Sequence, residues 1–276
     1  MKKVGIFYHP LVEATQTKAK QLQYFLASSG IAAWLCSAWE GETARKYLDD
    51  TDLVLSVGGD GTILRSAQAV VPRMIPIVGI NLGKLGFMTE LSADEAADKL
   101  PLLLSGEGWI DERAMLQAEL SAKGQEKNTY HALNDVVVAR GAVARLVRVA
   151  ASINGTHLAD YKADGVVLAT ATGSTGYALA AGGPVLYPQA KDFVLVPVMP
   201  HLSPANAFVL SAETVVQLRV TAAHQATFSI DGHTNLPLPD GAVVTVRPGP
   251  HRTRFLRIHP QDTFYRSLEQ KLKGKR

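Results

Sequence analysis

The chain has 276 residues, of which 47% are hydrophobic and 19% are charged. This composition excludes a disordered chain, which would be poor in apolar residues and rich in charge, and the length predicts one large or two small domains. The formal net charge is +3, and residues 247–276 hold nine Lys or Arg against two Asp or Glu. Because no aromatic-interleaved RNA motif accompanies this basic end, we expect a solvated terminal helix and no nucleic-acid partner.

Strand and helix patterns alternate in the N-terminal part of the chain. Short apolar runs are typical of buried strands, and apolar residues three or four apart predict helices between them. Such alternation predicts a parallel sheet that is covered on both sides. We therefore expect an α/β domain with a Rossmann-like parallel sheet over residues 1–107. Its predicted strands are residues 3–8, 31–36, 52–57 and 75–80, and its predicted helices include residues 17–29 and 63–70.

Beyond Arg113, strand patterns follow one another with Gly, Asn, Pro and Asp between them and with little helical spacing. This succession predicts an all-β domain, so we expect a β-rich, sandwich-like second domain over residues 108–254. A final helix is predicted at 263–273, within a segment, 255–276, that can pack back on the first domain. The strands predicted in the second domain are residues 114–121, 130–140, 146–153, 165–170, 193–198, 215–220, 226–230 and 243–246.

The chain holds a single cysteine, Cys36. One cysteine cannot form an internal disulfide or a Cys-rich zinc site, which favours a reducing compartment. The long uncharged runs at 165–190 and 193–212 are interrupted by polar residues, Gly and Pro, whereas a membrane-spanning helix needs about 20 mostly apolar residues. The apolar stretch at 4–8 is too short for a signal peptide. We therefore expect a cytoplasmic protein with no membrane partner.

The strongest local signal is the sequence Gly-Gly-Asp-Gly-Thr at residues 58–62, between a predicted buried strand and a predicted helix. The backbone N–H groups of such a loop and the positive end of the helix dipole suit a phosphate. Thr62 can cap the helix or touch an anion, and Arg65 lies one turn further along. The same residue types are also common in a plain turn.

Asp60 needs a separate explanation, because a carboxylate would repel a phosphate bound to this loop. It can take a proton from an attacking hydroxyl, or it can hold Mg²⁺. A G-x-G-x-x-G dinucleotide fingerprint is absent here. Residues 79–85 resemble a P-loop but are one residue short and end in Leu85 where Ser or Thr is required, which excludes a P-loop NTPase.

A second loop, at residues 170–177, follows a predicted strand and is dense in small residues and hydroxyls. These groups suit ribose and amide groups, Asp164 lies at the entrance of the strand, and Tyr177 can pack on a base. The alternative is a Thr/Ser-rich β turn with a core tyrosine. The order Gly-Ser-Thr-Gly at 173–176 does not match the G-x-S-x-G elbow of a serine hydrolase.

Two further turns have both a structural and a functional interpretation. Asn134 and Asp135 enter a predicted strand and are turn formers by default, although they can also bind sugar hydroxyls. Residues 229–233 are typical of a hairpin turn, and His201 and His233 are interpreted as surface or satisfied histidines. No histidine has metal-ligand spacing, so we expect no metal held by the protein alone.

Taken in order, these motifs resemble the NAD kinase family over nearly the whole chain. The match comprises Gly-Gly-Asp-Gly-Thr at 58–62, Asn-Leu-Gly-Lys-Leu-Gly-Phe at 81–87 and Asn134-Asp135, followed by Asp164-Gly165, Thr-Gly-Ser-Thr at 172–175, Gly-Gly-Pro at 182–184, Pro200-His201 and Ile-Asp-Gly at 230–232. The resemblance implies phosphorylation of the 2′-hydroxyl of the adenosine ribose of NAD, with ATP or a similar donor and Mg²⁺, to give NADP. It also implies homodimers or homotetramers with a site between the two domains.

The resemblance further implies roles for residues at matching positions. Asp60 would be the general base for the 2′-hydroxyl, Phe87 would pack on the adenine, and Asp164 would bind the nicotinamide amide end. Asn134 and Asp135 would hold ribose hydroxyls or the adenine edge. Phosphates would lie near Gly58, Gly59 and Thr62. The remaining NAD contacts would be Gly61, Arg65, Arg145, Lys162, Thr175, Gly176, Tyr177, Ala180 and His233, with Arg145 and Lys162 able to reach across a subunit interface.

The chain departs from the family pattern at positions that bear on substrate preference. Asp135 stands where Glu is usual, and Gly176 and Ala180 stand where Ala and Ser are common. Two rival interpretations are a lipid kinase of the diacylglycerol type and a non-catalytic NAD(P)-binding regulator. The lipid kinase would need a second Gly-rich segment ending in Thr-x-Asn-Asp, which residues 79–87 do not provide, and a regulator has no need for a base at Asp60.

Overall fold

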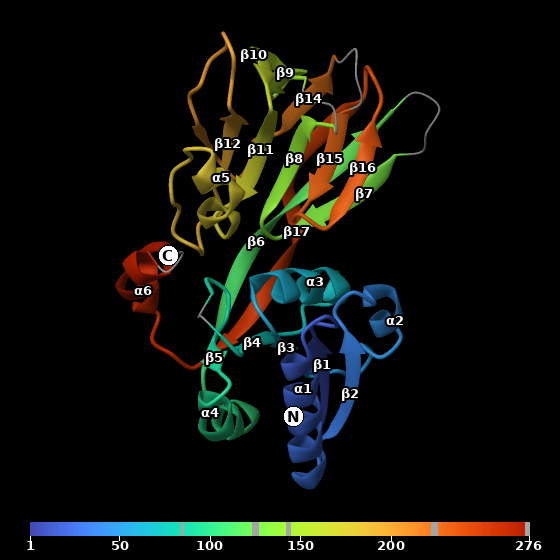
Figure 1. Cartoon of the computed structure of the whole chain (residues 1–276), viewed down its shortest axis with the longest axis vertical. Helices are drawn as coiled ribbons and strands as arrows, with labels where there is room; N and C mark the ends of the chain where they lie inside the picture. Colours follow the sequence, from blue (N-terminus) through green and yellow to red (C-terminus); the bar gives the residue numbers. More distant parts are fainter. Residues whose placement is uncertain (84–85, 123–126, 142–144, 222–225, 274–276) are drawn as a thin grey trace. The chain divides into compact units, whose positions relative to one another are not determined.

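The structure is a computed structural model that describes residues 1–83, 86–122, 127–141, 145–221 and 226–273 (Figure 1). The chain forms two compact units. Unit 1 comprises Met1–Glu112 and Thr253–Arg276, and unit 2 comprises Arg113–Arg252. Unit 1 is an α/β domain and unit 2 is built of strands, which confirms the expected fold class.

Unit 1 is organised around a parallel sheet in the order β4-β3-β1-β2. Its strands are short apolar runs, and β3 and β4 are buried along their whole length because helices cover both faces. The end of β17 continues the sheet beyond β4, with Phe255 paired in parallel to Ile77. The strands of unit 1 are β1 (Lys3–Tyr8), β2 (Ala32–Ser37), β3 (Leu53–Val57), β4 (Ile77–Asn81) and β5 (Leu91–Ser92), and the last of these pairs with β4.

Helices α1 and α4 pack on one face of this sheet, where their apolar side chains join those of the strands in one core. Helix α3 covers the opposite face, where Ser66 donates a hydrogen bond to Ser56 at 3.0 Å. The α3 helix is thereby fixed directly behind the carboxyl end of β3. The helices of unit 1 are α1 (Glu13–Ser28), α2 (Gly41–Arg45), α3 (Asp60–Val70), α4 (Glu95–Leu104) and α6 (Thr263–Lys273).

Unit 2 is a sandwich of two sheets around one apolar core. One sheet has the strand order β13-β12-β11-β8-β15-β16, of which β12, β11, β8, β15 and β16 are labelled side by side in Figure 1. The other contains β10-β9-β14 and the first part of β17, together with β6 and β7. Ala178 of α5, together with Ala181 and Leu186 beyond that helix, packs on the outer face of β8, β11 and β12, and β11 is buried throughout.

The elements of unit 2 follow each other with short connections. They are β6 (Trp109–Ser121), which begins in unit 1, β7 (Asn128–Ala132), β8 (Asp135–Arg140), β9 (Val147–Ile153), β10 (Thr156–Ala163), β11 (Gly165–Thr170), η1 (Gly173–Thr175), α5 (Tyr177–Ala180), β12 (Phe193–Val198), β13 (Phe208–Leu210), β14 (Val216–Val220), β15 (Ala226–Ile230), β16 (Thr234–Leu238) and β17 (Val243–Arg257), which ends in unit 1.

Three predicted elements differ from the structure. The strand predicted at 130–140 is two strands, because the chain turns at Leu133 and Asn134. The strand predicted at 243–246 continues to Arg257, although Pro248 and Pro250 indicate a break. The helix predicted to start at Ile63 begins at Asp60, so the carboxylate lies in its first turn. Within the described ranges, no helix combines the length and the apolar character that a membrane crossing requires.

Candidate active site

The Gly-Gly-Asp-Gly-Thr loop lies at the carboxyl end of β3, where ligands usually bind in open parallel sheets. Strand β3 ends at Val57, Gly59 is the N-cap residue of α3, and Asp60 opens the helix. No side chain caps this helix end. Its first backbone N–H groups therefore remain suited to an anion, as the sequence predicts. Gly59 and Gly61 are exposed, whereas Asp60 is half-buried.

The Asp60 carboxylate is held by the segment 86–89. Phe87 N donates to Asp60 Oδ2 at 2.8 Å, and Met88 N donates to Asp60 Oδ1 at 3.1 Å. The chain approaches so closely that a Cβ at Gly86 would lie 2.2 Å from Asp60 Oδ1, which only glycine avoids. The carboxylate thus has a fixed direction, and each of its oxygens retains a second lone pair.

Two further residues of this loop differ from their expected contacts. Thr62 neither caps the helix nor reaches the surface, because its side chain is buried and its Oγ1 has no hydrogen-bond partner. The guanidinium of Arg65 lies 4.2 Å from the centre of the Trp39 ring, in a cation–π contact. Burial lowers the pKa of Arg65. Trp39 in turn contacts His9, with ring centres 4.4 Å apart and ring planes tilted by 58°.

In unit 2, strand register brings several predicted residues to one end of the six-stranded sheet. Asp135 begins β8 and pairs with Ala169 near the end of β11, while Val136 pairs with Ile230 at the end of β15. The 134–135 turn, the 170–177 loop and the 231–233 turn therefore lie together. Their meeting follows from antiparallel pairing, since β8 starts where its two neighbours finish.

Asp231 organises this end of the sheet, a role that the sequence does not indicate. Its carboxylate accepts three backbone hydrogen bonds, from Leu133 N at 3.0 Å, Asn134 N at 2.7 Å and Asp135 N at 3.0 Å. Asp231 itself has a positive φ of 50°, which an aspartate tolerates better than most residues. The hairpin turn expected at 229–233 is present, and its aspartate holds the 133–135 turn in shape.

The loop at 170–177 packs directly against the same turn. Thr170 Oγ1 donates to Leu133 O at 2.6 Å, and a Cβ at Gly173 would lie 2.1 Å from Asn134 O. Asn134 Oδ1 is buried without a hydrogen-bond partner. A buried acceptor without a partner is costly, so this amide oxygen is an exception among buried polar atoms.

Asp135 is a buried acid with a raised pKa. Its side chain is 7% exposed. Burial and, secondarily, the nearby Asp231 carboxylate raise its pKa from 3.8 to about 7. Burial disfavours the charged form of Asp135 and the Asp231 carboxylate adds to this, so near neutral pH Asp135 can carry a proton and act as a hydrogen-bond donor.

Replacing Asp135 with Asn is expected to make the stability of unit 2 less dependent on pH. The folded chain keeps the Asp135 proton up to a pH of about 7, whereas the unfolded chain loses it near 3.8. The stability that this proton contributes is fully present below pH 3.8, and it is lost as the pH rises through about 7. As the pH rises from about 5 to about 8, the unfolding free energy of the wild type should therefore fall by about 3 kcal/mol more than that of Asp135→Asn.

Urea denaturation followed by circular dichroism at several pH values checks this expectation. Asp240→Asn, at an exposed position of the same unit, is the matched control. A difference between Asp135→Asn and wild type that stays constant over this pH range would contradict the raised pKa of Asp135.

Three predicted residues lie at the opposite end of the β11 strand. Asp164 precedes β11 and forms an ion pair with Arg140, with Arg140 Nε 2.8 Å from Asp164 Oδ1. Lys162 and Arg145 are exposed, and the β9–β10 pairing brings their neighbours Ala163 and Val147 together. A strand of six residues spans roughly 17 Å from its first to its last residue. Within one chain, these three residues are therefore not assembled with the 134–135 turn.

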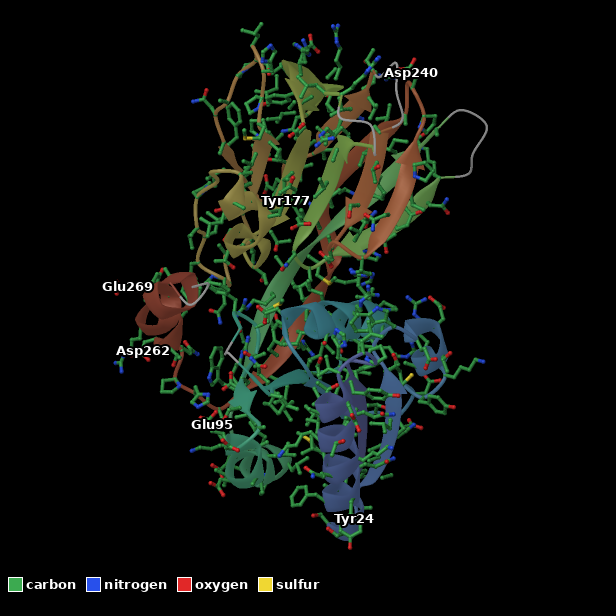
Figure 2. All side chains as sticks on the ribbon, viewed as in Figure 1. Tyr24, Glu95, Tyr177, Asp240, Asp262 and Glu269 are labelled. Carbon is green, nitrogen blue, oxygen red and sulfur yellow. The ribbon has the colours of Figure 1, made fainter. Side chains whose placement is uncertain are left out.

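The remaining predicted residues surround the 170–177 loop and the 231–233 turn. Tyr177, which is labelled in Figure 2, opens α5, and 45% of its surface is exposed; Ala180 ends that helix in an exposed position. Thr175 Oγ1 donates to Thr172 O at 3.3 Å, and His233 Nδ1 lies 3.2 Å from Asp231 O. Gly176 approaches the Asn134 amide, because a Cβ there would lie 3.7 Å from Asn134 Nδ2.

Sequence models of known families match both units. The ATP-NAD kinase N-terminal domain matches residues 4–108, and the ATP-NAD kinase C-terminal domain matches residues 133–258. An NAD kinase of Dehalococcoides mccartyi is 46% identical over 99% of this chain and 96% of the relative. An NAD kinase of Chloroflexus aurantiacus is 37% identical over 99% of both chains.

Solved structures show the same architecture. A yeast NADH kinase in complex with NADH superposes with a TM-score of 0.88 at 22% identity, covering 100% of this chain and 88% of the other. An NAD kinase from Archaeoglobus fulgidus in complex with ATP gives a TM-score of 0.79 at 26% identity, over 99% of both chains. These relatives favour neither a lipid kinase nor a non-catalytic regulator. Matched along nearly its full length, the chain belongs to the ATP-NAD kinase family and is an enzyme of that kind.

Proposed function

We propose that this enzyme transfers the terminal phosphoryl group of ATP to the 2′-hydroxyl of the adenosine ribose of NAD, giving NADP and ADP. A bond forms between the ribose oxygen and phosphorus, the bond from that phosphorus to the leaving ADP oxygen breaks, and the hydroxyl proton passes to a base. Such a transfer needs mainly positioning and charge stabilisation. Family membership and the ATP-bound relative support this reaction.

Asp60 is the proposed base, and its geometry is the observation that carries the proposal. The carboxylate lies at the carboxyl end of β3 and is directed by the N–H groups of Phe87 and Met88. Each oxygen uses one lone pair for these bonds and keeps another for the incoming proton. The glycines on both sides, Gly59 and Gly61, leave no side chain between the backbone and a ligand.

The phosphates are proposed to contact the loop 58–62, with its exposed helix N-terminus. Thr62 can contribute only through a rearrangement or by supporting the backbone, because its hydroxyl is buried. Arg65 is half-buried and can present its guanidinium edge to NAD while its face remains on Trp39. Phe87 is proposed to pack on the adenine.

In unit 2, the turn at 134–135 is proposed to hold the adenine edge or ribose hydroxyls. The Oδ1 of Asn134 is buried, so like the Thr62 hydroxyl it can accept a ligand N–H only through a rearrangement, whereas a protonated Asp135 can donate to a ligand oxygen or nitrogen. The exposed ring of Tyr177 can stack on NAD. The other proposed contacts from this end are Thr175, Gly176, Ala180 and His233.

Mg²⁺ is proposed to accompany the phosphates of ATP. Both oxygens of Asp60 already accept hydrogen bonds, and among the described residues no three His, Cys, Asp or Glu side chains gather in a way that could hold a metal. We therefore propose that Mg²⁺ does not rely on a cage of side chains from the described part of the chain. Mg²⁺ commonly keeps waters and substrate phosphates as its ligands, where it neutralises charge.

A homodimer or homotetramer is proposed as the working form. Arg145, Lys162 and Asp164 lie at the end of β11 away from the 134–135 turn, which supports a contact with NAD bound to a neighbouring copy. Light scattering coupled to gel filtration tests this. A cytoplasmic location is also proposed, since a single cysteine fits a reducing compartment.

The reaction is tested with the purified full chain, NAD, ATP and MgCl₂. An NADP-specific dehydrogenase, added after the incubation, is expected to detect NADP that increases with time and depends on ATP. Reactions without ATP or with ATP but without NAD are the controls. If no NADP forms with ATP or with any other phosphoryl donor, the proposal is wrong.

A further inference from the structure

A buried cluster of charged residues lies behind the segment that holds Asp60. It comprises Glu90, Asp111 and Arg257, which are 6%, 2% and 6% exposed. Arg257 ends β17, whereas Asp111 lies on β6 and Glu90 follows the 86–89 segment. Charged side chains are rarely this buried, and a buried ion pair seldom stabilises a fold more than apolar packing does. The cluster therefore calls for a role other than stability.

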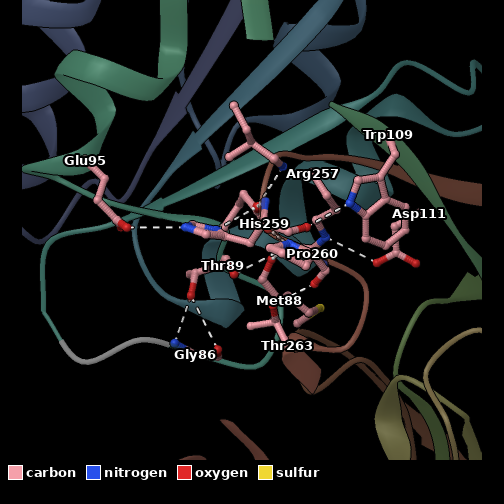
Figure 3. Close-up of polar contacts among 12 residues, drawn as sticks. Gly86, Met88, Thr89, Glu95, Trp109, Asp111, Arg257, His259, Pro260 and Thr263 are labelled. Atoms are coloured by element: carbon pink, nitrogen blue, oxygen red, sulfur yellow. Dashed lines mark hydrogen bonds and ion pairs between the residues drawn. The ribbon is translucent and has the colours of Figure 1, made fainter. Parts of the chain in front are cut away.

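The Arg257 guanidinium joins all parts of this cluster. Its Nη1 donates to Glu90 Oε2 at 3.1 Å and to Met88 O at 2.9 Å, and its Nε donates to Asp111 Oδ2 at 3.2 Å (Figure 3). Only a planar group with several fixed donors can satisfy these acceptors at once. The carbonyl oxygen of Met88 is thus tied to the end of β17.

Glu90 anchors the same segment from its other side. Its Oε1 accepts hydrogen bonds from Ile258 N and His259 N, both at 2.8 Å, and lies 2.9 Å from His259 Nδ1. His259 Nε2 lies 3.3 Å from Glu95 Oε1, so the ring bridges two acidic side chains, as Figure 3 shows for Glu95. The carboxylate oxygens of Glu90 are therefore matched by partners from the C-terminal segment, whereas the partners of Arg257 come from residues 88–111.

Met88 connects this cluster to the candidate base. Its N–H donates to Asp60 Oδ1, and its carbonyl accepts from Arg257 Nη1. We propose that Glu90, Asp111 and Arg257 form a clamp that positions Asp60 by fixing the 86–89 segment. The inference depends on the proposed function of Asp60. None of the three clamp residues contacts Asp60 directly in the described contacts, so they are positioning residues and not catalytic ones.

The test is Arg257→Lys, which keeps the positive charge but cannot reach Met88, Glu90 and Asp111 together. We expect kcat to fall about 10–100-fold, since a misplacement of about 1 Å can cost this much. In the Asp60→Asn background, the same change should lower the residual rate by less than about twofold, because residues that act as a unit are not additive. Arg254→Lys is the matched control, since Arg254 lies on the same strand and pairs with Glu112 at 2.8 Å near the surface. It should leave kcat unchanged.

Hydrogen exchange provides a readout that does not depend on activity. In Arg257→Lys, the backbone N–H groups of Phe87 and Met88 should exchange at least about tenfold faster than in wild type and in Arg254→Lys, because a loosened segment opens more often. If Arg257→Lys does not fold, Glu90→Gln replaces it. This variant keeps the shape of the side chain and removes its charge, and the same measurements of kcat and hydrogen exchange then test the clamp.

A folded variant with a kcat within about twofold of wild type, or with unchanged exchange at Phe87 and Met88, overturns the clamp. Wild-type enzyme that forms no NADP would instead contradict the proposed function. In that case the exchange measurement still decides whether the clamp fixes the segment.

Discussion

Asp60→Asn is expected to lower kcat by roughly 10²–10⁴-fold, the usual contribution of a general base. The amide has nearly the shape of the carboxylate, but it cannot take the proton of the ribose hydroxyl. One of its two positions also becomes a donor, which faces the N–H of Phe87 or Met88 where an acceptor is needed. The affinity for NAD should change less than about threefold, since no binding contact is removed.

Steady-state kinetics and isothermal titration calorimetry measure the two quantities separately. Asp52→Asn is a suitable control, because Asp52 also accepts two backbone hydrogen bonds in unit 1, from Lys2 and Lys3, but lies at the start of β3. A kcat of Asp60→Asn close to that of wild type would show that another group accepts the proton.

Gly173→Ala should damage unit 2 more than an ordinary glycine substitution. The added methyl group would lie 2.1 Å from Asn134 O and 2.5 Å from the carbonyl carbon of Asn134, and backbone cannot move aside as a side chain can. Overpacking of this kind typically costs about 1–3 kcal/mol of unfolding free energy, and we expect the upper end of that range. NAD binding should weaken at least about tenfold, because the 134–135 turn must shift.

Chemical denaturation and NAD titration check this pair of effects. Gly41→Ala is the matched control, since its added methyl group would meet Ala69 at an ordinary 3.5 Å within unit 1. It should leave NAD binding unchanged and preserve or slightly raise stability. Equal stabilities for the two variants would mean that η1 adapts without moving Asn134.

Much of the fold follows from local patterns in the sequence. Strands β12 and β15 match their predicted bounds, and α6 does as well, because apolar periodicity and turn residues define them locally. Strand β10 was missed because its buried residues are partly alanines, which give a weak strand signal. Strand β16 was missed because Pro237 suggests a turn, although an edge strand accepts proline.

The candidate site was predictable only where one short segment carries the chemistry. Gly59, Asp60 and Gly61 form a local strand–loop–helix unit, which a sequence motif can reveal. The supports of the site depend instead on contacts between distant parts of the chain. Asp231 binds Asp135 N from 96 residues away, and Arg257 binds Glu90 from 167 residues away. Taken singly in the sequence, these residues look like a turn aspartate and a basic residue near the chain end.

The two-part composition of unit 1 has a consequence for how the protein is made. A ribosome synthesises Met1–Glu112 first, then all of unit 2, and only afterwards the Thr253–Arg276 segment. Until that segment emerges, Glu90 lacks Arg257 and the N–H groups of Ile258 and His259, and a carboxylate without partners resists burial. Closure of unit 1 around Glu90 therefore requires residues 257–259, which are synthesised only after all of unit 2.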